Sequence, residues 1–396
     1  MQGMTAMTMP SYSALACDPR SIAESVRSAI EEGRSEAEST RRLPAPLLAV
    51  LRAAGAFRLL TPQELGGFEA DLPTMLQALE AFGRIDGSVA WNVWNGNLGF
   101  SAALFEPAGV SAVWGDGPDP VIANSARPTG AAVPTDGGFM LSGRWDIVSA
   151  IDSADWVALF GIVLDADRPR IVASGMPDIR VFFLRKDQIT VLDTWQVNGM
   201  RGTGSNSVVV EGQFVAEYLA PSPFASTMID RPLYRVPAFT LAACGSAAVV
   251  LGMAQSSIDE VVAMADGKAT GNGQTLRHRE HAHTAVAIAG AKLRGARLLL
   301  HATAADIMAT ATQGSPIPDQ LRGALRAAMS HAGRTSREVV TAMYELGSSS
   351  SLYLGNRLEQ IFRDTNAAAQ HALLQPTHFE TAGRLMMGLG PGVAVF

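Results

Sequence analysis

The chain has 396 residues, of which 47 % are hydrophobic, and its formal net charge is −6 at pH 7. This length can bury a large core and suits two or three packed units. The acidic balance argues against a nucleic-acid-binding protein, which needs a basic face. Two cysteines far apart in the sequence, Cys17 and Cys244, predict neither a disulfide framework nor a metal site. A reducing, cytoplasmic location is therefore the default expectation.

Neither a signal peptide nor a membrane span is expected. Residues 1–16 lack a basic segment followed by an apolar one. The stretch 236–258 has no charged residue and is long enough to cross a bilayer, but it is rich in small residues and contains Pro237. Because the chain shows no second span and no interfacial basic cluster, we interpret this stretch as the central helix of a bundle.

Hydrophobic periodicity divides the chain into three predicted domains. A 3.6-residue period before residue 118 predicts an N-terminal helical domain (1–118) with helices over 21–38, 43–56, 72–82 and 88–104. A run of Gly, Asp and Pro at 115–120 marks its end. From 119 to 225 the period changes to two, which predicts a small β-barrel or sandwich. A C-terminal helical bundle (226–396) follows, with helices over 233–265, 276–311, 317–347 and 356–374.

The most informative local feature is a polar, glycine-rich loop between two β segments. Its key residues are Gly199, Arg201, Gly202, Thr203, Gly204 and Ser205. Glycine lets a backbone approach a ligand closely, and hydroxyl, amide and guanidinium groups suit a polar, anionic partner. The same residues are also compatible with a plain turn in which Thr203 and Ser205 cap the local backbone.

Two further motifs accompany this loop. Ser-Gly-Arg-Trp at 142–145 is followed by Ser149, and Arg363-Asp364 is followed by six residues and His371. With the helix–β–helix order, residues 20–390 resemble the acyl-CoA dehydrogenase superfamily. Within it they are more similar to the reduced-flavin-dependent monooxygenases: two-component phenol hydroxylases, the dibenzothiophene S-oxygenase and amino-sugar N-oxygenases. The resemblance implies an α+β, mostly α fold with a helical domain, a central β-barrel-like domain and a four-helix bundle.

The resemblance also implies an activity. Reduced FMN or FAD, bound non-covalently and supplied by a separate NAD(P)H flavin reductase, would form a C4a-hydroperoxyflavin with O2. One oxygen atom would then pass to a small aromatic, heteroaromatic, amine or sulfur compound. The sequence contains no phosphate-binding glycine motif, so we expect no nicotinamide site in the chain itself. Two alternatives stay open: an acyl-CoA dehydrogenase that uses Glu380 as base, and an inactive scaffold of the same fold.

Family positions imply roles for individual residues. Ser149 matches the hydrogen-bonding position near the flavin N5, and His371 matches an imidazole that exchanges a proton near pH 7. The expected flavin-binding residues are Trp145, Ser149, Arg201, Thr203, Ser205, Arg277 and Arg279, the last two for a flavin phosphate in the same or a neighbouring subunit. Each also has a structural interpretation: Ser149 as a turn serine, His371 as a core histidine, Trp145 as core packing.

One departure from the phenol hydroxylases concerns the substrate. Their helix before the β-domain carries a histidine that helps to deprotonate the phenol, whereas no histidine precedes His278 here. Asn97 or Leu98 takes the matching place in the expected substrate pocket, beside His371. This favours a substrate that needs no phenolate, such as an amine, a sulfur compound or an electron-rich heteroaromatic ring.

The remaining expectations concern metals and assembly. His278, His281 and His283 do not share one helix face, so no metal site is predicted. The long apolar helices carry more apolar surface than one bundle needs, which together with the resemblance predicts a homotetramer.

Overall fold

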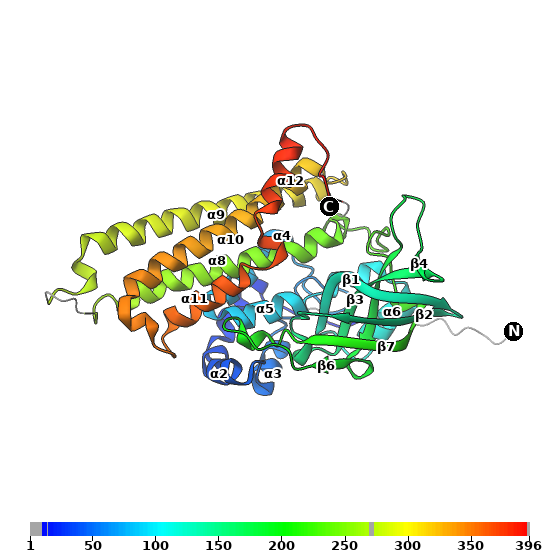
Figure 1. The fold of residues 1–396 in the computed structure, drawn as a ribbon, viewed down its shortest axis with the longest axis horizontal. Coiled ribbons are helices and arrows are strands. Elements are labelled where there is room, and N and C mark those ends of the chain that lie inside the picture. The colour runs from blue at the N-terminus through cyan, green and yellow to red at the C-terminus, as the bar shows by residue number, and fades with distance from the viewer. Residues whose placement is uncertain (1–9, 14, 269–272, 394–396) are drawn as a thin grey trace.

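The structure, a computed structural model, describes residues 10–13, 15–268 and 273–393 (Figure 1). Helices, a sheet and then long helices follow one another in the chain, which confirms the α+β, mostly α fold class. The first six α-helices are α1 (Ile22–Ser25), α2 (Arg27–Thr40), α3 (Ala45–Ala53), α4 (Leu72–Ile85), α5 (Gly87–Gly96) and α6 (Pro107–Trp114).

Helix α5 occupies the centre of the molecule. It begins where the Asp86 carboxylate accepts a hydrogen bond from the Val89 backbone N–H at 3.1 Å. All ten of its residues are buried, and it lies between the sheet and the long helices (Figure 1). The helix predicted over 88–104 is wrong beyond Gly96, where Asn97 ends it, and a 3₁₀ segment (Gly99–Leu104) follows.

A seven-stranded sheet forms the middle of the chain. Its strands are β1 (Ile122–Thr135), β2 (Gly138–Trp145), β3 (Trp156–Asp165), β4 (Arg168–Pro169), β5 (Ile179–Arg185), β6 (Thr190–Leu192) and β7 (Ser207–Ala216). Their order is β4-β3-β1-β2-β7-β6, with β5 also paired to β3. Among the described strands of this sheet, β1 and β3 are the one parallel pair. A tight turn joins β1 to β2 through Gly137, whose φ of +73° favours glycine.

Strand β1 contains a large bulge. Ser125 pairs with Leu159 of β3, but the next pair is Gly130 with Gly161, so residues 126–129 face Phe160 alone. The Thr129 hydroxyl fixes the bulge by donating a hydrogen bond to the Arg144 carbonyl at 2.7 Å. Such bulges redirect side chains, often beside active sites.

The C-terminal half is a helical bundle. It contains α7 (Pro232–Arg235), α8 (Ala238–Met264), α9 (Glu280–Thr312), α10 (Asp319–Gly347), α11 (Arg357–Ala368) and α12 (Thr377–Met386). The helix predicted over 356–374 is wrong beyond Ala368: α11 ends there, and His371 caps a short 3₁₀ turn (Ala372–Leu374).

Helix α8 is the core helix of the bundle. Its backbone approaches that of α4 closely at two glycines. A Cβ atom added at Gly83 would lie 2.5 Å from the Val249 carbonyl oxygen, and one added at Gly252 would lie 2.2 Å from the Glu80 carbonyl oxygen. Among the described helices, α8 alone is long and apolar enough to cross a membrane, and 67 % of its most apolar window is buried inside the protein.

Candidate active site

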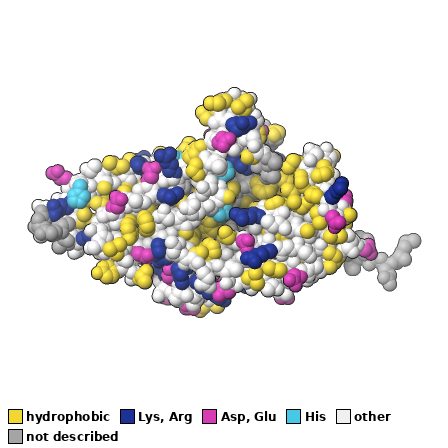
Figure 2. Space-filling model, viewed as in Figure 1, with side chains coloured by type: hydrophobic (Ala, Val, Ile, Leu, Met, Phe, Trp, Pro, Cys, Tyr) yellow, Lys and Arg dark blue, Asp and Glu magenta, His cyan; other side chains and the backbone are white. Residues whose placement is uncertain are grey.

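Where the sheet meets the bundle, a cavity of about 370 Å³ brings together residues from distant parts of the sequence. Hydrophobic, basic and histidine side chains gather near this junction on the face shown in Figure 2. Four groups of residues contribute to the lining of the cavity: Trp94, Asn95, Asn97 and Leu98 at the end of α5 and directly after it; Asn124, Ser125 and Arg127 on β1; Ile147 and Ser149 after β2; and Gln370 and His371 after α11. The cavity thus combines apolar walls with a few polar groups, as small-molecule sites do.

Ser149 is the cavity end of a chain of buried hydroxyl groups. Its Oγ lies 2.8 Å from Ser205 Oγ, which lies 2.7 Å from Thr203 Oγ1. Thr203 Oγ1 donates to the Met200 carbonyl at 2.8 Å. Since a hydroxyl donates one hydrogen bond only, Ser205 must donate to Thr203 and Ser149 must donate to Ser205. All three hydroxyl groups therefore donate away from the cavity.

Ser149 keeps one lone pair for a ligand. Its Oγ also accepts a hydrogen bond from Trp91 Nε1 at 3.2 Å, which occupies the other lone pair. The serine is 5 % exposed and has no other described partner. Ser149 thus presents an acceptor, not a donor, to whatever enters the cavity.

His371 lines the same cavity as Ser149 and is neutral near pH 7. Burial, helped by the positive charge of Arg127, lowers the pKa of His371 from 6.5 to about 4. Its Nδ1 accepts a hydrogen bond from the Leu373 backbone N–H at 3.3 Å, so we assign the proton of the neutral ring to Nε2. Trp91 and Trp94 pack edge-on against the ring, with centroids 5.4 and 5.5 Å away. The imidazole is therefore held in place by its neighbours and offers a hydrogen-bond donor at Nε2.

The Arg363–Asp364 motif fixes the glycine-rich loop instead of forming an ion pair of its own. The Asp364 carboxylate accepts from the Met200 backbone N–H at 2.6 Å, and Met200 has a left-handed φ of 55°. Burial and the nearby Asp86 raise the pKa of Asp364 to about 7. Arg363 binds Glu359 and the Asn198 carbonyl. Together these contacts hold the residue whose carbonyl terminates the hydroxyl chain.

The loop glycines allow close packing against other parts of the protein. A Cβ at Gly199 would lie 2.4 Å from the Arg363 carbonyl oxygen. Gly204 has a φ of +53°, and a Cβ there would lie 2.6 Å from Asp152 Oδ2. Within the described chain, therefore, these glycines bring the loop against α11 and the turn after β2.

Several residues expected at the flavin do not line the cavity. Trp145 is fully buried in the sheet, and its Nε1 donates to the Phe160 carbonyl at 2.8 Å. Arg201 donates to the carbonyls of Glu38 and Val197. Thr203 and Ser205 stand behind Ser149.

Asn97 and Leu98 both line the cavity, but differently. Asn97 Nδ2 donates to the carbonyls of Ala56 and Val93, and its Oδ1 accepts from the Leu59 N–H. Both N–H donors of its amide are thus used within the protein, while its Oδ1 accepts one hydrogen bond and keeps one lone pair. Leu98 adds an apolar wall, which continues into an adjoining hollow of about 60 Å³ lined by Phe160, Phe183 and Phe239.

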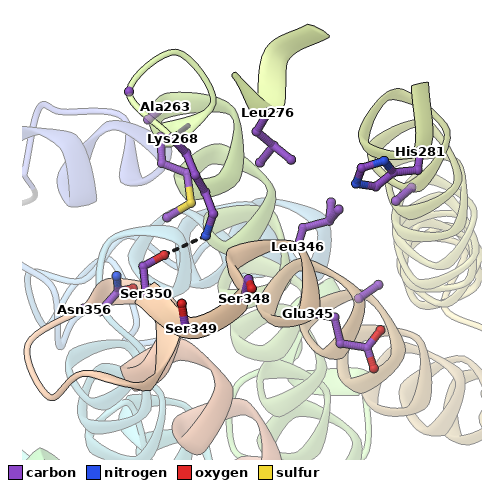
Figure 3. Close-up of a pocket in the computed structure, with 14 residues that line it drawn as sticks. Ala263, Lys268, Leu276, His281, Glu345, Leu346, Ser348, Ser349, Ser350 and Asn356 are labelled. Carbon is purple, nitrogen blue, oxygen red and sulfur yellow. Dashed lines mark hydrogen bonds between the residues drawn. The ribbon is translucent and has the colours of Figure 1, made fainter. Parts of the chain in front are cut away.

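A second, more open hollow of about 1200 Å³ lies where the end of α8, the start of α9 and the end of α10 meet (Figure 3). Lys268 Nζ donates there to Ser350 Oγ at 2.7 Å, and His281 lies on the opposite wall. Burial lowers the pKa of Lys268. Arg277, which follows the lining residue Leu276 in the sequence, forms an ion pair with Asp266. Neither Arg277 nor Arg279 lines the first cavity.

Two alternative sites find no support in the described residues. Glu380, the candidate dehydrogenase base, is exposed on α12 and does not line the cavity. No group of three His, Cys, Asp or Glu side chains in residues 10–13, 15–268 and 273–393 is arranged to hold a metal ion.

Some cavity residues could not be recognised from the sequence. Trp94 lines the cavity, whereas Trp91 does not line it but packs against the His371 ring. Both lie in an ordinary helical pattern, and their contact with His371 depends on the tertiary fold. Arg127 lies in the bulge of β1, and Asn124 and Ser125 directly precede the bulge on the same strand; all three line the cavity. Pro128 is a local signal of this bulge, since proline inside a strand often marks one.

Comparison with known families matches both helical parts. Residues 19–106 match the family described as acyl-CoA dehydrogenase, N-terminal domain. Residues 244–376 match acyl-CoA dehydrogenase, C-terminal domain.

Individual relatives are similar over nearly the whole chain. The flavin-dependent monooxygenase oxygenase subunit HsaA of Rhodococcus jostii (strain RHA1) is 31 % identical over 365 residues, which cover 88 % of this chain and 92 % of the relative. Indole-3-acetate monooxygenase of Pseudomonas putida is 28 % identical over 382 residues, 96 % of each chain. The structure of XiaF from a Streptomyces species, in complex with FADH2 and glycerol, aligns with a TM-score of 0.88 at 26 % identity, covering 96 % of this chain and 97 % of that one.

Proposed function

Since the chain belongs to the family of flavin-dependent monooxygenase oxygenase subunits with acyl-CoA dehydrogenase domains, we propose that it is the oxygenase component of a two-component system. It takes reduced flavin from a separate NAD(P)H flavin reductase. With O2 it adds one oxygen atom to a small aromatic compound, and the other oxygen atom leaves as water. The observation that carries this proposal is the meeting of Ser149 and His371 at one cavity with aromatic walls.

The donor and acceptor groups of the cavity suit a reduced flavin. When bound, the flavin supplies the two electrons that activate O2. Ser149 offers a lone pair, which matches the N–H at N5 of the reduced ring but not the bare nitrogen of the oxidised ring. The buried Ser125 hydroxyl lines the same cavity and makes no hydrogen bond with a described residue, so it is available to the polar edge of the ring.

His371 acts on the substrate side of the reaction. As a neutral ring with its proton on Nε2, it can donate a hydrogen bond to an oxygen atom that gains negative charge during the transfer. The two tryptophans hold it in place and keep water away from it. Leu98 and the adjoining phenylalanine-lined hollow would receive the apolar part of the substrate.

We further propose that the flavin is reduced FMN or FAD, bound non-covalently, and that the enzyme works in the cytoplasm as a homotetramer. Arg277 and Arg279, which lie outside the cavity of their own chain, would then reach a flavin phosphate in a neighbouring subunit.

The test is turnover with and without a reductase. Purified protein with flavin, NADH and a candidate aromatic substrate should form no product. Adding any unrelated flavin reductase should start product formation, with one atom of ¹⁸O from ¹⁸O2 in the product. NADH oxidation coupled to oxygenation without a reductase would refute the proposal.

A further inference from the structure

The bulge in β1 places an arginine on the cavity wall. Residues 126–129 face a single residue of β3, so the strand is pushed out of the regular ladder there. Ala126 borders both the main cavity and the phenylalanine-lined hollow, and Arg127 borders the main cavity. The anchored Thr129 hydroxyl holds this geometry. The bulge therefore brings Arg127 to the wall of the main cavity, directly after Ala126, which also borders the apolar hollow.

Arg127 has no carboxylate partner among the described residues, unlike the arginine on the neighbouring strand. Arg144 pairs with Asp146 at 2.9 Å, and the Ser207 hydroxyl donates to the same Asp146 oxygen at 2.8 Å. Asp146 also lines the cavity, and its pKa is lowered by these contacts and by the charge of Arg127, although no ion pair joins Asp146 to Arg127. The positive charge of Arg127 also helps to lower the pKa of His371.

A cation at the edge of an apolar cavity favours an anionic ligand. The planar guanidinium binds a carboxylate through two parallel hydrogen bonds, which neutral groups cannot match in strength. A carboxylate at Arg127 would leave the apolar body of the same molecule beside Ala126 and Leu98, next to the phenylalanine-lined hollow.

We propose that Arg127 recognises the carboxylate of the substrate, so that the enzyme acts on aromatic carboxylic acids. This inference rests on the proposed oxygenase function and names its substrate class. Arg127 acts in binding and orientation, while Ser149 and His371 serve the flavin and the reacting atoms. The phosphate of the flavin is the other anion that could reach a guanidinium in this cavity, and the test separates the two.

The test measures binding of charged and neutral probe pairs. Benzoate, phenylacetate and indole-3-acetate are each compared with the corresponding amide by anaerobic isothermal titration calorimetry on the full-length protein with reduced flavin. At least one acid should bind about tenfold to a hundredfold more tightly than its amide, the range of a charge-assisted hydrogen bond. Arg127→Gln should abolish this preference and leave the amide affinity within about twofold. Arg127→Lys should restore part of it.

Arg168→Gln is the matched control, because Arg168 is an exposed strand arginine that does not line the cavity. This variant should keep the wild-type preference. The proposal is overturned if no acid binds the wild type more tightly than its amide, or if the preference survives in Arg127→Gln.

Flavin binding separates this inference from the proposed function. Reduced FMN and reduced riboflavin should bind wild type and Arg127→Gln alike. If Arg127→Gln weakens only the binding of reduced FMN, the guanidinium serves the phosphate, and the substrate inference is overturned while the oxygenase function stands. If the wild type binds no reduced flavin but still prefers carboxylates, the oxygenase function fails instead.

Discussion

Ser149 illustrates how buried neighbours decide what one hydroxyl offers to a ligand. On its own, a serine can donate or accept, but Ser205 and Thr203 take up its proton and Trp91 takes up one lone pair. The remaining lone pair fits a ligand N–H. The sequence identified the three hydroxyl residues, but their order as a chain depends on how the loop folds back on the turn after β2.

Ser205→Ala tests this hydrogen-bond direction. Without Ser205, the Ser149 proton can turn into the cavity, where it can bind the bare N5 of oxidised flavin. We expect the ratio of the dissociation constants of oxidised and reduced flavin to fall about fivefold, the effect of roughly 1 kcal/mol from one neutral hydrogen bond. Fluorescence and anaerobic absorbance titrations measure both constants. Ser257→Ala, a buried serine bonded within α8, is the control; an unchanged ratio in Ser205→Ala would contradict the assigned direction.

His371→Ala separates an active-site histidine from a core histidine. Reduced flavin should still bind, while product formation falls about a hundredfold, as expected for loss of one donor to developing charge. Oxygen consumption should then appear as released hydrogen peroxide. Product and peroxide per reduced flavin are measured beside a melting curve, with His378→Ala as control. Early melting with normal coupling to product would show that the role of His371 is structural.

At the level of the elements, helices could be predicted but their ends at the site could not. The 3.6-residue pattern indicated α4, α9 and α10 because each has a buried face, whereas α8 was indicated by its long uncharged run, which is buried on all sides from Cys244 to Ala254. The breaks after Gly96 and Ala368 depend on contacts from elsewhere, such as the Asn97 amide that reaches Ala56 and Leu59. Both breaks carry cavity residues, so periodicity was least informative where the site lies.

The stability that the contact between α11 and the glycine-rich loop contributes should depend on pH. The pKa of Asp364 is raised from 3.8 to about 7 in the folded protein, so the folded state binds more protons than the unfolded state between these values. This contribution therefore lowers stability as pH rises through that window. Asp364→Asn removes it, so the stability of the variant relative to wild type should increase from pH 4 to pH 7. Urea unfolding at several pH values measures the difference; a constant difference would contradict the burial of this charge.

Because α4 and α8 cross closely, a larger side chain at the crossing should destabilise the folded protein. A methyl group at Gly252 would meet backbone atoms of α4, which cannot move aside as a side chain can. We expect Gly252→Ala to lower the free energy of unfolding by about 1–3 kcal/mol, the usual cost of overpacking. Gly290→Ala, on α9 with open space around it, should have no such cost. Equal melting temperatures for the two variants would contradict the close crossing.

For the whole molecule, the helix–sheet–helix layout could be read from the sequence, and the exposed apolar surface adds a reason to expect assembly. Leu352, Tyr353 and Leu354, three consecutive residues after α10, are 66 %, 72 % and 87 % exposed. Large apolar side chains gathered on a surface usually mark an interface.

Light scattering at micromolar concentration should therefore give the mass of a homotetramer. Leu354→Glu should lower this mass, because a buried carboxylate at an interface is unfavourable. A wild-type mass of one chain would contradict the predicted assembly.

The most direct test of the oxygenase function is the reaction of the reduced-flavin complex with oxygen in a stopped-flow instrument. We predict that the visible absorbance of oxidised flavin appears only after a lag, because a flavin bound in this largely apolar cavity would return to its oxidised form more slowly than free flavin. With an aromatic acid present, product should form within the same turnover. If oxidised flavin instead appears in a single step, at the rate of free reduced flavin and without product, the chain is not an oxygenase.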